Sequence, residues 1–81
     1  MDDLPSFAMQ EISRYLIQRP DAADTAEGVH HWWIQWPDSA APMAVTLAAL
    51  EQLERDGLMQ HIRIGSRDIW RRRQPAASSG D

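Results

Sequence analysis

The sequence contains no cysteine and no lysine. Without cysteine, a disulfide framework and a thiolate metal site are excluded. All eight basic residues are therefore arginine, a choice that genomic base composition explains as easily as a need for bidentate contacts. The longest uncharged run, Ser39 to Leu50, is well short of the ~20 residues that a membrane-spanning helix needs, and the start, MDDLPSF, is acidic where a signal peptide is basic. We expect a cytoplasmic protein without a membrane partner.

Positive charge is scarce in the first part of the chain and concentrated in the last part. The 81 residues, 43% of them hydrophobic, suffice for one small domain and exclude a second. Residues 1–56 hold ten Asp or Glu and three Arg, a net charge of −7, whereas residues 57–81 hold five Arg and two Asp, a net charge of +3, which together give the −4 of the chain. The C-terminal part is thus the basic end of an acidic protein.

The first two thirds of the chain are predicted to be helical. A first helix begins near Leu4–Ser6 and ends before Pro20, because the residue preceding proline is disfavoured in the α region. Asp21–Ala23 is a connection, and Asp24–Glu27 is typical of a capping box that starts a second helix. Apolar residues at offsets of 0, 3, 4 and 7 mark the buried stripe of that helix: Val29, Trp32, Trp33 and Trp36.

The third helix belongs to the segment Ala44–Met59, around which the rest of the chain is organised. Pro37 ends the second helix, and Asp38 or Ser39 is available to cap the third, so that the two form a helix-turn-helix. Gly57 suits the left-handed residue that closes a helix. The apolar stripe has helical spacing: Thr46, Ala49, Leu50 and Leu53.

A β-hairpin is predicted to follow. Leu58–Ile64 alternates like a half-buried strand, with Leu58 and Ile62 directed to the core. Gly65–Asp68 forms a four-residue turn, Ile69–Arg73 forms the second strand, and residues 74–81 form a disordered tail. The predicted core is Ile12, Tyr15, Leu16, Val29, Trp33, Leu50, Leu53, Leu58, Ile62 and Trp70.

This order of elements resembles the winged-helix superfamily. The most specific residues are Ala49-Leu50, Leu53 and Gly57-Leu58-Met59, and Trp70 stands where the family often has an aromatic residue in its second wing strand. The resemblance covers Leu4–Arg73. It implies a mainly α, α+β fold: a three-helix winged helix-turn-helix domain over residues 4–73 with a C-terminal two-stranded wing. The superfamily contains DNA-binding, RNA-binding and protein-binding members, so the fold does not select a function.

The outward side of the third helix lacks the residues that read DNA. Its N-terminal part, Ala40–Ala48, offers no side chain for a bidentate base contact, Glu51 and Glu54 repel phosphate, and Gln52 is the one polar candidate. Exposed apolar patches often mark interfaces. We therefore expect a protein-interaction face at Met43, Val45 and Leu47, with a second copy of the chain or another protein as the partner. The alternative is that Val45 and Leu47 belong to the core.

The wing carries a basic cluster: His61, Arg63, Arg67, Arg71, Arg72 and Arg73. These side chains suit a phosphate backbone, which makes a transcription regulator with weak, sequence-independent DNA contact the second hypothesis. They also suit a hairpin that charge protects from aggregation, or the acidic half of another subunit.

Chemistry on small molecules is not expected. The sequence shows no nucleophile–base pattern and no glycine-rich phosphate loop, so we expect no enzyme, no cofactor and no small-molecule substrate. The neighbours His30 and His31 point about 100° apart on a helix, which does not suit chelation of one ion, and no metal site is expected.

Overall fold

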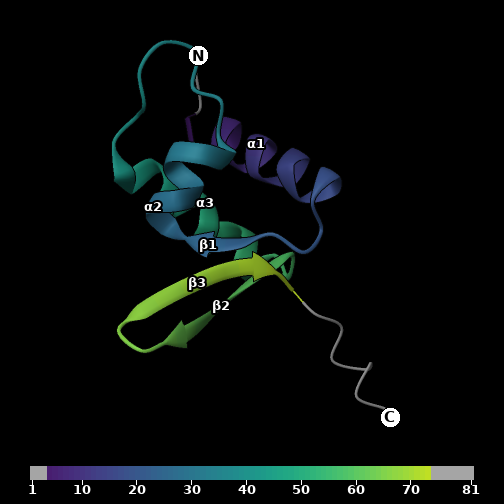
Figure 1. The fold of residues 1–81 in the computed structure, drawn as a ribbon. Helices are drawn as coiled ribbons and strands as arrows, with labels where there is room; N and C mark the ends of the chain where they lie inside the picture. The colour runs from purple at the N-terminus through teal and green to yellow at the C-terminus, as the bar shows by residue number, and fades with distance from the viewer. Residues whose placement is uncertain (1–3, 74–81) are drawn as a thin grey trace.

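The computed structural model describes residues 4–73 and arranges them in two layers, with helices packed on one face of a sheet (Figure 1). Within these residues there are three helical regions and a three-stranded antiparallel sheet, which confirms the α+β class. The helical elements are α1 (Leu4–Gln18), α2 (Ala26–Gly28), the π-helical η1 (Val29–Trp33) and α3 (Met43–Arg55). The strands are β1 (Ala23–Thr25), β2 (Met59–Ile64) and β3 (Arg67–Arg72).

Helix α1 confirms the first prediction, since it starts at Leu4 and ends before Pro20. Ala8, Ile12 and Leu16 recur every four residues and are buried against the other helices. Tyr15, on the flank of this stripe, is half-buried and stacks on Trp33 with ring centroids 4.6 Å apart. None of the helices between Leu4 and Arg73 is long and apolar enough to cross a membrane.

The N-cap of the second helix is one residue later in the sequence than predicted. Thr25, not Asp24, is the N-cap, and its Oγ1 accepts the Gly28 N–H at 3.1 Å. The carboxylate of Asp24 instead accepts the N–H of the next residue, Thr25, at 2.8 Å, so it does not act as the cap acceptor that the predicted capping box required. A Cβ at Gly28 would overlap this carboxylate, so glycine is needed for the close approach of a side chain.

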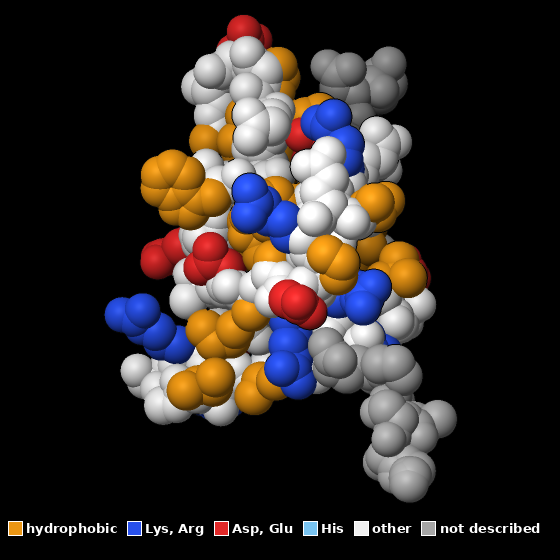
Figure 2. Space-filling view, turned by 45° about the vertical axis from the view of Figure 1, so that its right-hand side comes forward, with side chains coloured by type: hydrophobic (Ala, Val, Ile, Leu, Met, Phe, Trp, Pro, Cys, Tyr) orange, Lys and Arg blue, Asp and Glu red, His pale blue; other side chains and the backbone are white. Residues whose placement is uncertain are grey.

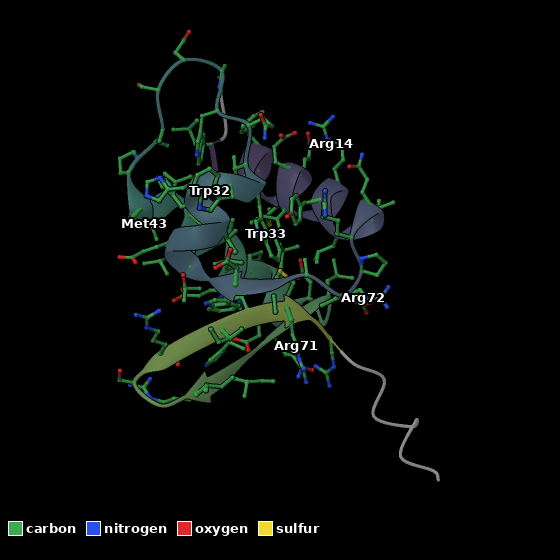
Figure 3. The ribbon with its side chains drawn as sticks, in the orientation of Figure 1. Arg14, Trp32, Trp33, Met43, Arg71 and Arg72 are labelled. Carbon is green, nitrogen blue, oxygen red and sulfur yellow. The ribbon has the colours of Figure 1, made fainter. Side chains whose placement is uncertain are left out.

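The predicted tryptophan stripe is only partly correct, because the second helix continues as the π-helix η1. A π turn closes its hydrogen bonds from residue i to i+5, so the residues that return to the core are further apart than in an α-helix. Val29, Trp33 and Ile34 are buried, whereas Trp32 is 72% exposed. Trp33 lies in the interior and Trp32 on the surface (Figure 3). Trp36 follows η1, is half-buried, and donates its Nε1–H to the His30 carbonyl at 2.9 Å.

Helix α3 begins at Met43 after Pro42, so neither Asp38 nor Ser39 caps it. Its C-terminus is as predicted: Gly57 has φ 82°, the Gly57 N–H donates to the Glu54 carbonyl, and the Leu58 N–H donates to the Leu53 carbonyl. This pair of bonds is the Schellman arrangement, which satisfies the last carbonyls and turns the chain toward the sheet. The predicted stripe of α3 is fully buried: Thr46, Ala49, Leu50 and Leu53.

The sheet has a strand that the sequence analysis missed. Ala23–Thr25, predicted as part of a connection and a helix cap, is β1 and pairs antiparallel with β3, so the sheet order is β1-β3-β2. Three residues carry too little alternation to be recognised, and β3 supplies the pairing. The hairpin itself is confirmed, with a shorter turn at Gly65–Ser66. The predicted tail, residues 74–81, lies outside the described residues.

The helices cover the opposite face of β2 from the one predicted. Met59 is fully buried and pairs with Arg72, while His61 pairs with the buried Trp70. Partners across a ladder project to the same side, so this is the covered face. Leu58 is 55% exposed and is not core. Of the ten predicted core residues, Tyr15 and Ile62 are half-buried, Leu58 is exposed, and the other seven are buried.

Candidate protein-interaction surface

The outward side of α3 is a continuous exposed stripe. Ala44, Leu47, Ala48 and Glu51 recur at offsets of 0, 3, 4 and 7, and all four are exposed. Leu47 is the largest apolar member and is 39% exposed. We call these four residues the α3 stripe. It is apolar over its first two turns and acidic at its end.

The three residues predicted for this face lie in three different environments. Leu47 is in the α3 stripe, and Met43, one turn earlier, is half-buried at the start of the helix (Figure 3). Val45 is turned inward and packs against the core. The alternative prediction placed both Val45 and Leu47 in the core. It is correct for Val45 and wrong for Leu47, which is exposed. Ala44 and Ala48, which sequence reasoning did not name as site residues, complete the exposed face.

A groove of about 520 Å³ runs beside the stripe, between α3, the start of α2 and the hairpin. Leu47 and Trp70 contribute apolar surface to its lining. Four carboxylates, one histidine and one arginine line it as well: Glu27, Glu51, Glu54, Asp68, His61 and Arg67. The groove is thus predominantly acidic, and an anionic phosphate backbone would meet repulsion there.

A polar contact joins α3 to the hairpin across this groove. Glu54 Oε2 lies 2.7 Å from His61 Nδ1 and accepts the His61 backbone N–H at 3.3 Å. The imidazole also packs on Trp70, with ring centroids 4.8 Å apart. These contacts hold His61, predicted as part of a basic wing, against the acidic helix. It is therefore not available to a partner in the way that the sequence suggested.

A buried histidine positions the first turns of α3. His30 is 4% exposed, and its Nδ1 lies 2.6 Å from Thr46 Oγ1. Burial lowers the pKa of His30, the neighbouring His31 lowers it further, and a hydrogen bond with the Ala41 backbone acts in the opposite direction. This hydrogen bond between His30 and Thr46 links η1 to the helix that carries the stripe.

The wing arginines do not form one patch. Arg63 pairs with Asp68 at 3.0 Å, and Arg67 lines the acidic groove. Arg71 points away from the helices, and Arg72, one residue on, projects to the other side of the sheet (Figure 3). Arg73 follows β3 and is exposed. Strand alternation therefore divides a cluster that looks continuous in the sequence.

Gln52, the one predicted polar reader of bases, already has partners on its own helix. Its Nε2 donates to Asp56 at 2.9 Å, and its Oε1 accepts from Arg55 at 2.8 Å. Across residues 4–73, no three His, Asp or Glu side chains lie close enough together to hold a metal ion. No protein-family model matches the chain, and neither a curated protein nor a solved structure matches it.

Proposed function

We propose that this protein is a winged-helix module that acts by binding a protein partner, a second copy of itself included, through the α3 stripe. The order of α1, η1, α3 and the hairpin supports the winged-helix assignment, with β1 as a third strand added to the wing. The observation that carries the proposed function is the exposure of Leu47 between Ala44 and Ala48, on the helix face where a DNA-reading member would carry polar side chains.

Electrostatics favours a protein partner over DNA at this face. Base recognition needs donors and acceptors aimed at base edges, and the stripe has only the carboxylate of Glu51. The neighbouring groove adds Glu27, Glu54 and Asp68. Burying an apolar side chain against a protein has no such requirement and is favourable in proportion to the area removed from water.

A second candidate is weak binding of duplex nucleic acid by the wing. Arg67, Arg72 and Arg73 are exposed and could neutralise phosphates without reading sequence. Such binding would involve only the phosphate backbone of the nucleic acid, because α3 contributes no base contact.

The test is Leu47→Glu, with Ile17→Glu as the matched control. Ile17 is 79% exposed on α1, far from the stripe in sequence, so both changes place a carboxylate at an exposed apolar position. We expect both variants to keep the helical circular dichroism and melting behaviour of the wild type. Only Leu47→Glu should reduce self-association by light scattering, or capture of a partner by the immobilised protein.

Two results would contradict the proposal. One is that Leu47→Glu unfolds the protein, which would place Leu47 in the core. The other is that Leu47→Glu and the wild type associate with the same partners at the same strength.

A further inference from the structure

The face of the sheet that points away from the helices carries a group of apolar side chains. Residues of β2 and β3 alternate between the two faces, and the buried Met59 and Trp70 identify the covered one. Ile62, Ile64 and Ile69 therefore lie on the outer face, where Ile64 is 61% exposed. Leu58, 55% exposed and joined to Arg73 by the bond from the Arg73 N–H to its carbonyl, extends this face at the start of β2. Within residues 4–73, no helix covers it.

The same face is positively charged. Arg71 and Arg73 have the alternation of Ile69 and lie beside the apolar residues, and the outward positions of β1, β2 and β3 include no carboxylate. Asp68 is on the covered side with its partner Arg63. The Nε of Arg71 is buried without a hydrogen-bond partner. Figure 2 shows hydrophobic side chains beside arginines over the hairpin at the lower end of the molecule. We call the surface formed by these apolar and basic residues the outer sheet face: Leu58, Ile62, Ile64, Ile69, Arg71 and Arg73.

An exposed sheet face of this kind would be expected to have a partner, and its composition restricts the choice. It has no aromatic side chain among its outward positions, so it offers no platform on which nucleic-acid bases could stack. An identical face on a second copy is also a poor partner, because a two-fold contact would bring Arg71 and Arg73 against themselves. A partner that complements the outer sheet face must therefore present an apolar surface with acidic residues beside it.

The chain itself carries such a surface. The α3 stripe presents Ala44, Leu47 and Ala48 beside Glu51, next to a groove lined by further carboxylates. We propose that the α3 stripe of one copy docks on the outer sheet face of a second copy. This inference rests on the proposed function and names the surface that receives the stripe. Leucine and alanine would cover the isoleucines, and Glu51 would approach the arginines.

The contact joins two different surfaces, which has a structural consequence. The stripe lies on the helix side of the molecule and the outer sheet face on the other side of the sheet (Figure 1). A single copy cannot bring its own two surfaces together. After one contact has formed, one copy still has a free outer sheet face and the other still has a free α3 stripe. Head-to-tail contacts of this type produce rings or open chains, not closed two-fold dimers. Salt should weaken the assembly, since exposed charges across the contact are screened.

The experiment combines two variants that each lose one surface. Leu47→Glu disrupts the stripe, and Ile64→Glu places a carboxylate on the outer sheet face at an exposed position. Each variant alone should self-associate roughly tenfold more weakly or worse, the effect expected at a central interface residue. Mixed together, they should form a complex of one Leu47→Glu chain and one Ile64→Glu chain, and nothing larger. Because the two variants have the same mass, one of them is uniformly labelled with nitrogen-15, and native mass spectrometry then resolves the mixed complex from dimers of either variant. Ile17→Glu should assemble like the wild type.

The outcomes separate this inference from the proposed function. If Leu47→Glu prevents association while Ile64→Glu assembles like the wild type, the stripe is an interface but the outer sheet face does not receive it. If the wild type stays monomeric at low salt and high concentration, the self-docking inference is wrong, and binding to another protein through Leu47 is unaffected. If Ile64→Glu alters the circular dichroism, Arg73→Glu, at an exposed position after β3, replaces it with the same expected results.

Discussion

Met59 and Leu58 are adjacent in the chain, and the structure assigns them opposite roles in stability. Met59 is fully buried under the helices, whereas Leu58 is 55% exposed. Truncation of a buried methionine to alanine costs about 2–5 kcal/mol, because apolar contacts are lost and a cavity remains. A domain of this size has a total stability of about 4–10 kcal/mol, so Met59→Ala should unfold a measurable fraction of the molecules. Leu58→Ala should cost about 1 kcal/mol or less, since little of that side chain leaves water on folding.

The assay is urea denaturation followed by circular dichroism, with both variants measured beside the wild type. A lower midpoint with an unchanged slope reports lost stability, and a changed slope reports a change in the surface exposed on unfolding. The order of the two losses is the decisive result. If Leu58→Ala destabilised the protein more than Met59→Ala, β2 would face the helices with its other side, and the outer sheet face would not exist.

Three further predictions address the second helix and the wing. The lowered pKa of His30 means that the unfolded chain, with a pKa of about 6.5, binds the proton more readily than the folded chain. Stability should therefore be complete above about pH 6.5 and fall as the pH drops toward the folded value. Urea midpoints against pH should show this slope in the wild type and lose it in His30→Gln. Gly28→Ala should destabilise the wild type, because the new Cβ displaces the Asp24 carboxylate, yet stabilise the Asp24→Ala variant by up to about 1 kcal/mol through helix propensity; equal effects in both backgrounds would refute the clash. Duplex DNA should bind weakly, without sequence preference and with a salt slope that Gln at Arg67, Arg72 and Arg73 flattens. Tight, sequence-dependent binding at physiological salt would instead support a DNA-reading regulator.

The sequence alone was sufficient for the features that depend on local spacing. Ala8, Ile12 and Leu16 define the buried side of α1, and Gly57 ends α3, because helical periodicity and the left-handed conformation of glycine act within a few residues. The hairpin after Gly57 was recognisable for the same reason, from alternation and a glycine turn. So was the apolar character of the third helix around Leu47.

Only the tertiary structure decided the features that depend on contacts between segments distant in the sequence. Strand β1 exists because β3 pairs with it, and three residues have no pattern of their own. The π turn of η1 moved Trp32 to the surface, although an α period would have buried it. Both faces of β2 carry apolar residues, so alternation defined two faces equally well, and the packing of the helices on Met59 selected one of them. The other face, with Ile64 exposed, stays uncovered within residues 4–73, because the helices described there pack on the Met59 side of the sheet.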